Sequence, residues 1–224
     1  MLSERFDADG FAGIPQVLPP EECEPLVEKL TALGSDSAGT RCLLAEDWCR
    51  SLAQRLRAHP AIAQLVPEHY AAVQCTYFEK SAERNWLVPI HQDLSIPVAS
   101  RVEHPALRGW SEKEGGTFVQ PPADVLAQLV AVRLHLDRCD ESDGPLQFVP
   151  GTHRYGRIGA EDASRYRQAG PLVACTAERG DALAMRPLVL HASSKADGGS
   201  RRRVLHVVFG PRALPFGLAW QRTV

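Results

Sequence analysis

The chain has 224 residues, of which 44% are hydrophobic and 23% are charged. A chain of this length can bury a large core as one domain, and its composition excludes intrinsically disordered and coiled-coil proteins. No stretch approaches the ~20 consecutive apolar residues of a transmembrane helix. Residues 1–9 are too polar and acidic for a secretory signal. We therefore predict a single domain over residues 1–224, located in the cytoplasm.

The net charge argues against some classes of partner, and the cysteines argue against some metal and redox motifs. The formal net charge is −2, so the chain lacks the basic excess of proteins that bind nucleic acids or anionic membranes. Its six cysteines are dispersed and form no C-x-x-C pair, which argues against a zinc ribbon or a thioredoxin-type motif. Dispersed, reduced cysteines fit a reducing compartment. We expect a small-molecule partner, no nucleic acid and no membrane. The sequence does not predict the oligomeric state.

The N-terminal part, about residues 1–70, is predicted to be mainly helical. One helix begins at Pro19-Pro20-Glu21-Glu22, continues with apolar residues at helical spacing, and ends at Gly34. A second helix is expected over residues 47–59, where an apolar stripe precedes Pro60.

The character of the sequence changes near Ala71, and short strands with turn signals follow. The predicted strands cover residues 72–78, 129–137, 146–149, 173–176, 181–185, 188–191 and 203–209. Turn signals include residues 143–145, 150–151, 179–181 and 197–199. Many short strands without intervening helices predict a jelly roll, sandwich or barrel over about residues 71–210. Residues 100–124 lack periodicity, and we expect them to form a loop that acts as a lid.

A possible metal site comes from the pattern of histidines and carboxylates. Residues i and i+2 of an extended segment face the same side, so His91 and Asp93 can bind one ion. His191 can supply a third ligand from a distant strand. Two histidines and one carboxylate form the facial triad of non-haem Fe(II) oxygenases, which leaves positions open for a bidentate cosubstrate and O2. His135-Leu136-Asp137 is a second pair of the same spacing, and either histidine could instead be an ordinary polar residue of a sheet.

Arg202 stands eleven residues after His191, within the run Arg201-Arg202-Arg203. A guanidinium there could hold the far carboxylate of a dicarboxylic acid in a bidentate pair. The alternative is a solvated turn. On a strand, Arg202 shares one face with His206, whereas Arg201 and Arg203 share the other.

Several of these segments resemble the phytanoyl-CoA dioxygenase family. The resemblance rests on residues 78–93, which end in His91-Gln92-Asp93, on residues 143–154 with their Gly-Pro-Leu and Pro-Gly-Thr-His-Arg motifs, on residues 180–183 leading to 191–194, and on Arg202. It implies a double-stranded β-helix, or jelly roll, that binds Fe(II) and 2-oxoglutarate. His91, Asp93 and His191 are then the metal ligands and catalytic residues, and Arg202 holds the cosubstrate. The resemblance also favours His91-Gln92-Asp93 over His135-Leu136-Asp137.

Other residues receive secondary roles. Further candidates for binding the cosubstrate are Gln92, Lys80, Asn85 and Arg41. Candidates for lining the substrate pocket are His135, Trp86 and Trp110. Gln92 stands between two ligands, so its side chain is expected to point the other way unless the segment bends.

The resemblance implies a dioxygenase that consumes 2-oxoglutarate and O2, releases succinate and CO2, and hydroxylates a small molecule. A carboxylate at Asp93, where related halogenases have Ala or Gly, favours hydroxylation over halogenation. Two other classes stay open. One is a cupin-like metal enzyme that does not use 2-oxoglutarate, against which the arginine run argues. The other is a jelly-roll binding module without catalysis.

Overall fold

The computed structural model describes residues 1–34, 39–170, 172–197 and 201–224. Its α-helices are α1 (Leu2–Asp9), α2 (Pro20–Ala32), α3 (Asp47–Ala58), α4 (Pro60–Ala63), α5 (Ala123–Leu126) and α6 (Ala160–Ala169). Within these described ranges, no helix has both the length and the apolar character needed to cross a membrane.

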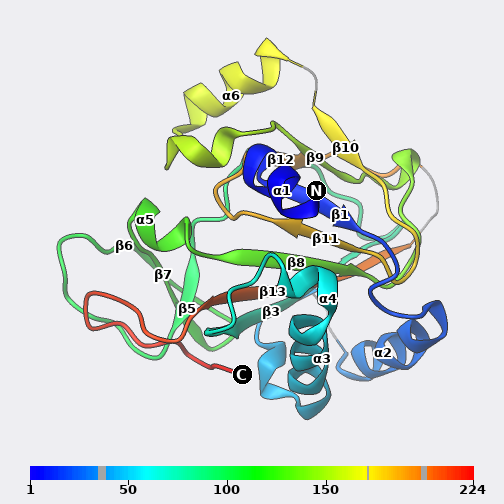
Figure 1. Cartoon of the computed structure of the whole chain (residues 1–224), viewed down its shortest axis with the longest axis horizontal. Helices are drawn as coiled ribbons and strands as arrows, with labels where there is room; N and C mark the ends of the chain where they lie inside the picture. Colours follow the sequence, from blue (N-terminus) through cyan, green and yellow to red (C-terminus); the bar gives the residue numbers. More distant parts are fainter. Residues whose placement is uncertain (35–38, 171, 198–200) are drawn as a thin grey trace.

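Two antiparallel sheets face each other and form a jelly roll (Figure 1). The larger sheet has the order β1-β11-β8-β13-β3-β2, and the smaller one β10-β9-β12-β4. The strands of the larger sheet are β1 (Phe11–Ile14), β2 (Gly39–Thr40), β3 (Tyr70–Lys80), β8 (Val130–His135), β11 (Ala182–Met185) and β13 (Arg202–Pro211). Those of the smaller sheet are β4 (Val88–His91), β9 (Leu146–Phe148), β10 (Val173–Cys175) and β12 (His191–Ser193). A third sheet, in the order β5-β7-β6, joins β5 (Ile96–Val98), β6 (Arg108–Lys113) and β7 (Gly116–Gln120).

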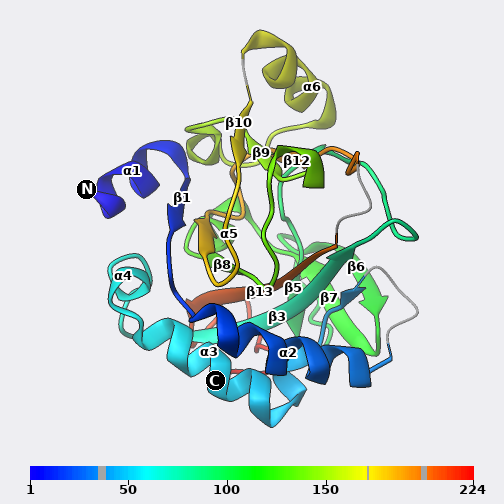
Figure 2. The ribbon, with the colours of Figure 1, turned by 90° about the vertical axis from the view of Figure 1, so that its right-hand side faces the viewer.

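Helices α2 and α3 cover the outer face of the larger sheet (Figure 2). Each is amphipathic, and its apolar stripe is buried against the sheet because apolar area removed from water stabilises the packed state. The buried helical residues are Cys23, Val27 and Leu30 of α2 and Cys49, Leu52, Ala53 and Leu56 of α3. They pack in one core with Leu205 and Val207 of β13.

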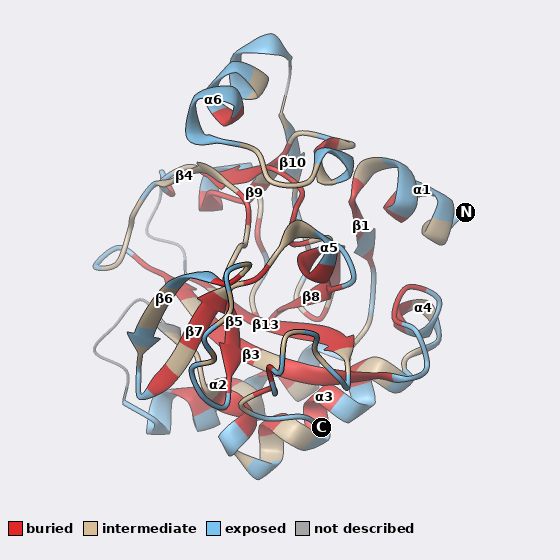
Figure 3. Cartoon of the chain, turned by 90° about the vertical axis from the view of Figure 1, so that its left-hand side faces the viewer, coloured by how far each residue is buried: buried red, intermediate tan, exposed pale blue. Residues whose placement is uncertain are grey.

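The space between the two main sheets is apolar at one end and polar at the other. At the apolar end Phe11 of β1 stacks on Phe148 of β9, with ring centroids 4.3 Å apart, within a second core. At the other end the inner faces of β3, β8 and β13 carry buried polar side chains, including Lys80, Arg133 and Arg202. Figure 3 shows that most of the central strands β3, β8 and β13 is buried. The apolar end holds the sheets together and leaves the polar end available for a site.

Most of the predicted elements are confirmed. The predicted helices correspond to α2 and α3, and the predicted strands at residues 72–78, 129–137 and 203–209 correspond to β3, β8 and β13. The part before residue 70 contains four helices among its described residues, but it also supplies β1, which pairs with β11. Of the turn predicted at residues 197–199, positions 198 and 199 lie outside the described residues.

The strand predicted at residues 188–191 is wrong, because the strand begins only at His191. Residues 186–189 form a turn in which the Val189 amide donates to the Arg186 carbonyl at 3.0 Å. The apolar run Leu188-Val189-Leu190 is buried but not extended into the sheet, and an apolar run alone does not distinguish these cases.

The loop predicted for residues 100–124 is also wrong. This segment contains the hairpin of β6 and β7, which pair antiparallel and continue onto β5. The turn is Glu114-Gly115, with positive φ angles of 50° and 72°. Two successive left-handed residues suit a tight hairpin, but Glu is an uncommon residue at the first position, so the turn carried no recognisable signal.

Candidate metal centre and cosubstrate pocket

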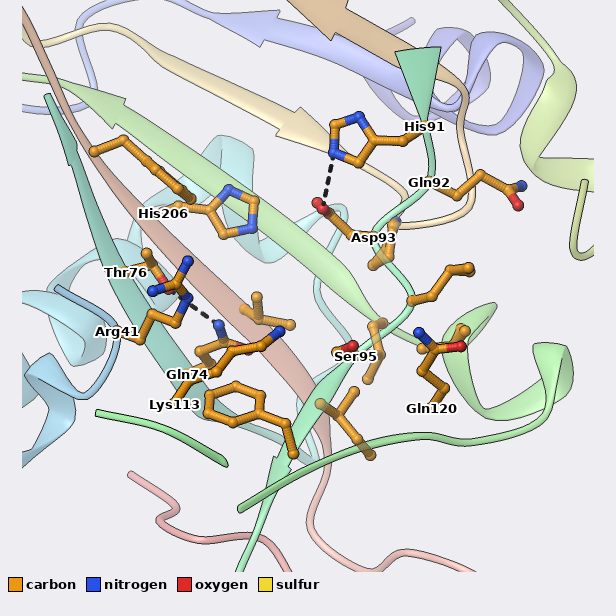
Figure 4. A pocket seen from close by; sticks show the side chains of 18 residues that line it. Arg41, Gln74, Thr76, His91, Gln92, Asp93, Ser95, Lys113, Gln120 and His206 are labelled. Carbon is orange, nitrogen blue, oxygen red and sulfur yellow. Dashed lines mark hydrogen bonds and ion pairs between the residues drawn. The ribbon is translucent and has the colours of Figure 1, made fainter. Parts of the chain in front are cut away.

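His91, Asp93 and His191 lie together where β4 and β12 pair. Figure 4 shows His91 and Asp93 of this group. Their ligand atoms all lie within 4.8 Å of one another. The Asp93 carboxylate is 3.7 Å from Nε2 of His91 and 3.8 Å from Nε2 of His191. His91 pairs with His191 across the two strands, so residues a hundred positions apart come into register.

The backbone fixes which nitrogen each histidine presents. Nδ1 of His91 lies 2.9 Å from the carbonyl of Pro89, and Nδ1 of His191 lies 2.9 Å from the carbonyl of Val189. Since a carbonyl only accepts, each Nδ1 carries the proton and each Nε2 keeps its lone pair for the side facing Asp93. Orienting contacts of this kind are typical of histidine metal ligands.

Electrostatics keep this group of residues ready to bind a cation. Burial lowers the pKa of His191 to about 4, although Asp93 partly opposes the shift, so the imidazole is neutral at neutral pH. Burial alone would raise the pKa of Asp93, but the neighbouring His191, His91 and His206 outweigh it and the pKa is lowered, which keeps the carboxylate ionised. Neutral imidazole and ionised carboxylate are the forms that ligate metals.

Gln92 lies between the two ligands and points away from them, as its place in an extended segment predicts. Its amide nitrogen donates to the carbonyls of Gly156 and Leu188, at 2.8 and 2.7 Å, and its oxygen accepts the Ile158 amide at 2.8 Å. These three bonds tie the ligand segment to the chain around residues 156–158 and to the turn before His191. Gln92 therefore has a positioning role in this geometry, with its amide already committed to the backbone.

A cavity of about 380 Å³ opens beside His91 and Asp93 (Figure 4). One wall is apolar and includes Phe118, Leu126 and Leu129. The polar lining comes from Arg41, Gln74, Thr76, Ser95, Lys113, Gln120 and His206. A concave, mixed surface next to a candidate metal centre is the form expected of a small-molecule site.

Arg202 and Lys80 lie behind this cavity, on neighbouring strands in register. Nζ of Lys80 donates to Oγ of Ser193 at 2.7 Å and to the Ser194 carbonyl. Arg202 donates to the Gly144 carbonyl, which also accepts Oγ of Ser193 at 2.8 Å. Within the described chain, neither cation has a carboxylate oxygen within 4 Å.

The three arginines of the run divide between the two faces of the sheet as the alternation predicts. Arg201 donates to Glu79 at 2.8 Å, and Arg203 makes a two-pronged pair with Asp137 at 2.6 and 2.8 Å. Only the middle arginine of this run points between the sheets, and its side chain is 6% exposed. The geometry therefore makes Arg202 the member of the run that can reach a ligand in the interior.

The remaining sequence candidates take different places. Asn85 makes a reciprocal pair of hydrogen bonds, 2.7 and 2.8 Å, with the backbone of Ala196, which occupies its amide. Arg41 lines the cavity and pairs with Glu114 at 2.9 Å. Trp86 lies over the Lys80 ammonium, 5.7 Å from ring centroid to Nζ, and Trp110 packs under Arg101. Trp86, Trp110 and His135 are not among the described residues that line the cavity.

The segment around residues 143–154 builds the support for this centre. Oγ1 of Thr152 accepts the Leu190 amide at 2.9 Å and donates to the Val149 carbonyl at 2.8 Å, which fixes the residue before His191. Gly144 has φ 62°, and a Cβ there would lie 2.4 Å from the Ser194 carbonyl oxygen. A glycine is therefore required where the chain passes the serine pair that holds Lys80.

Sequence reasoning missed three residues of this interior: Arg133, Ser193 and His206. Arg133 donates to Nδ1 of His206 at 3.1 Å, and both side chains are buried. Ser193 lies two residues after His191, within a motif already noted. The sequence did place Arg133 and His135 on the same face of a predicted strand, because they are two residues apart. It did not show which strand lies next to β8, and so which residues Arg133 contacts.

Two observations indicate that the residues of the candidate metal centre and of the interior behind it suit iron and 2-oxoglutarate. Two imidazole nitrogens and one carboxylate are the donor set of non-haem Fe(II) sites. Behind them, Nε of Arg133 and Nε of Arg202 are buried without a hydrogen-bond partner in the described structure. Orphaned guanidinium donors in the interior fit a carboxylate-bearing ligand.

Comparison with solved structures shows the same fold at low sequence identity. HygX from Streptomyces hygroscopicus, solved with nickel and 2-oxoglutarate bound, is 19% identical, with TM-score 0.65 over 94% of this chain and 87% of that chain. The epimerase SnoN from nogalamycin biosynthesis, in complex with Fe3+, alpha ketoglutarate and nogalamycin RO, is 18% identical, with TM-score 0.71 over 98% and 87%. AviO1 from Streptomyces viridochromogenes Tue57 is 21% identical, with TM-score 0.60 over 96% and 95%.

No curated protein sequence matches the chain significantly. The family model described as phytanoyl-CoA dioxygenase (PhyH) matches residues 6–204, which include the candidate metal centre and Arg202. Because this match covers most of the chain, the protein belongs to the phytanoyl-CoA dioxygenase family of iron- and 2-oxoglutarate-dependent enzymes, which use O2.

Proposed function

We propose that this protein is a hydroxylase that oxidises a small molecule with O2 and 2-oxoglutarate and releases succinate and CO2. His91, Asp93 and His191 hold the iron, and Arg202 with Ser193 binds the far carboxylate of 2-oxoglutarate. The observation that carries the proposal is the pairing of a three-residue metal centre with buried, carboxylate-free cations behind it. When bound, iron and 2-oxoglutarate supply the oxidising power for a C–H bond.

The chain's own residues bind, orient and exclude water. The carbonyls of Pro89 and Val189 orient the two imidazoles, and Gln92 holds the segment between them. The larger sheet closes the cosubstrate end, because Lys80 and Arg202 are buried there. A dry environment strengthens the electrostatic hold on a carboxylate.

The cavity limits the class of substrate. Its volume of about 380 Å³ lies near the lower end of small-molecule pockets, so a compact substrate fits. Phe118, Leu126 and Leu129 give it an apolar side, while Gln74 and Thr76 of β3 offer hydrogen-bonding groups. These features favour a small substrate with both a hydrocarbon part and polar substituents.

The first test is an anaerobic titration of the protein with Fe(II) and 2-oxoglutarate, followed in the visible range. A charge-transfer band from the chelated 2-oxo acid is expected, and Arg202→Ala should weaken or abolish it at the same concentrations. Iron binding without the band would favour a cupin-like enzyme that does not use 2-oxoglutarate. No iron binding would favour a non-catalytic module, and His91→Ala is the control that defines specific binding.

The second test separates hydroxylation from other outcomes of the same cofactor chemistry. Small molecules are screened for stimulation of succinate formation, and each hit is repeated under 18O2. A product that gains one labelled oxygen supports hydroxylation. Succinate formation with a product of unchanged mass, or one that has lost two hydrogens, would replace hydroxylation by epimerisation, cyclisation or desaturation.

A further inference from the structure

Arg133 reaches from β8 across the middle strand of the larger sheet. It is in register with His206 of β13, and its guanidinium donates to Nδ1 of His206 at 3.1 Å. Its guanidinium carbon also lies 5.2 Å from the ring centroid of Phe78 on β3, one strand further. Phe78 is in register with Val204, two residues nearer to Arg202 along β13. The guanidinium therefore lies over β13, between His206 and Arg202.

Arg133 has no anion in direct contact among the described residues, although the Asp93 carboxylate acts on it electrostatically from a distance. The side chain is 7% exposed, its Nε has no hydrogen-bond partner, and no described carboxylate oxygen lies within 4 Å. His206 and Phe78 supply a hydrogen-bond acceptor and a ring face, but neither supplies a negative charge. Leaving a buried charge unpaired is strongly destabilising, so a ligand that brings an anion is the expected partner.

The neighbours of Arg133 point to the metal side of the interior. His206 lines the cavity next to Asp93 (Figure 4). Arg202 lies four residues further along β13, which is about 13 Å for an extended strand, beside Lys80. Along β13, Arg133 therefore lies between His206, on the metal side, and Arg202.

We infer that Arg133 is a second cosubstrate-binding residue, which binds the 2-oxo carboxylate end of the cosubstrate while Arg202 binds the far carboxylate. This inference rests on the proposed use of 2-oxoglutarate. It assigns a cation to each end of the molecule, with Arg133 at the end nearer the metal. Donation to Nδ1 also leaves the proton of the neutral His206 ring on Nε2, a second N–H donor on the same side.

The test compares two probes that differ only at the far end. 2-Oxoglutarate carries both carboxylates, and 2-oxopentanoate has the same chain length without the far one. Their dissociation constants are measured by anaerobic calorimetry on Fe(II)-loaded protein. Arg133→Met should weaken both probes about 10- to 100-fold, the range for losing hydrogen bonds to a charged group, and Arg202→Met should weaken 2-oxoglutarate alone.

The melting temperature of the metal-free protein distinguishes a binding role from a structural one. Loss of a structural residue would lower it. Arg133→Met should leave the melting temperature unchanged or raise it, because a buried charge without a direct ion-pair partner is removed. The matched control is Arg203→Met, on the opposite face and paired with Asp137. It should lower the melting temperature and leave both dissociation constants unchanged. Arg133→Lys, which keeps the charge but loses the planar fork, should show an intermediate loss of affinity.

Three results would overturn the inference. Unchanged affinities in Arg133→Met, with a lower melting temperature, would make Arg133 structural. Loss of affinity for 2-oxoglutarate alone would place Arg133 at the far carboxylate. A wild-type protein that binds iron but neither probe would refute the proposed function itself, which distinguishes that failure from the other two.

Discussion

The ammonium of Lys80 should make cosubstrate binding depend on pH. Burial lowers its pKa from 10.5 to about 8, and the neighbouring positive charge of Arg202 adds to the shift. The other titratable groups that affect it are Arg133 and Cys139. A carboxylate bound between Lys80 and Arg202 opposes both causes, so we expect the pKa of Lys80 to return to its ordinary value in the complex.

The size of the effect follows from linkage between protons and ligand. With a pKa of about 8 the free lysine is about 91% protonated at pH 7 and about 24% at pH 8.5, whereas with the ordinary value of 10.5 the bound lysine is about 99% protonated at pH 8.5. Binding should therefore take up about 0.1 proton at pH 7 and about 0.75 proton at pH 8.5, and affinity should fall about fourfold between them. The sign is fixed, because the complex holds more protons than the free protein.

Calorimetry in buffers of different ionisation enthalpy measures this proton uptake directly. Lys80→Met removes the group and should abolish the uptake at pH 8.5, together with most of the fourfold change in affinity. Lys113→Met is the matched control, since Lys113 lines the cavity and does not lie beside Arg202 as Lys80 does. Uptake at pH 8.5 that is the same in wild type and Lys80→Met would refute the reasoning, because the proton would then come from another group.

Three further substitutions test the metal centre and its support. Asp93→Asn should weaken Fe(II) binding by more than the roughly 10- to 100-fold seen for loss of an outer contact, measured by anaerobic titration. Gln92→Ala removes three backbone hydrogen bonds and should lower the free energy of unfolding in urea by about 3 kcal/mol. Gly144→Ala should cost about 1–3 kcal/mol in backbone strain alone, plus the clash with Ser194, and lower the melting temperature. Gly13→Ala, which meets open space, should change it little.

The choice between the two His-x-Asp pairs shows what the sequence could predict. Both pairs have the spacing of residues on one face of an extended segment. In the structure only His91 and Asp93 come together with His191 as a candidate metal group among the described residues. Asp137 lies beyond the end of β8 and is committed to Arg203. The motif around the first pair favoured the residues that the structure brings together, whereas spacing alone could not exclude the second.

The division of the arginine run was also predictable, because alternation along a strand depends only on local geometry. Arg202 points inward and its neighbours point outward, where they find carboxylates. The same reasoning could not predict the neighbours of Arg133. Its importance comes from the strand order β8-β13-β3, which brings it beside His206 and Phe78. That order depends on pairing between residues 69 to 79 positions apart for β8 and β13 and 122 to 141 positions apart for β13 and β3, and a single sequence does not specify it.

The prediction of a loop over residues 100–124, where the structure has the hairpin of β6 and β7, was wrong for a different reason. Its strands are polar on one side and its turn uses Glu114, so neither the alternation nor the turn stands out from a loop. The hairpin supplies Lys113 and Phe118 to the cavity. Whether it also moves as a lid is a separate prediction: limited proteolysis in this segment should slow when cosubstrate and substrate bind, and unchanged cleavage would contradict it.

The two ends of the proposed site share one short strand. β12 carries His191 at its first residue and Ser193 at its last, and residues two apart on a strand point to the same side. His191 belongs to the candidate metal group, whereas Ser193 contacts Lys80 and the Gly144 carbonyl, where we propose that the far carboxylate of 2-oxoglutarate binds. We therefore expect a ligand that orders β12 at either end to order the residue that the other ligand needs. Because such coupling is reciprocal, if iron raises the affinity for the 2-oxo acid, then the 2-oxo acid must raise the affinity for iron by the same factor.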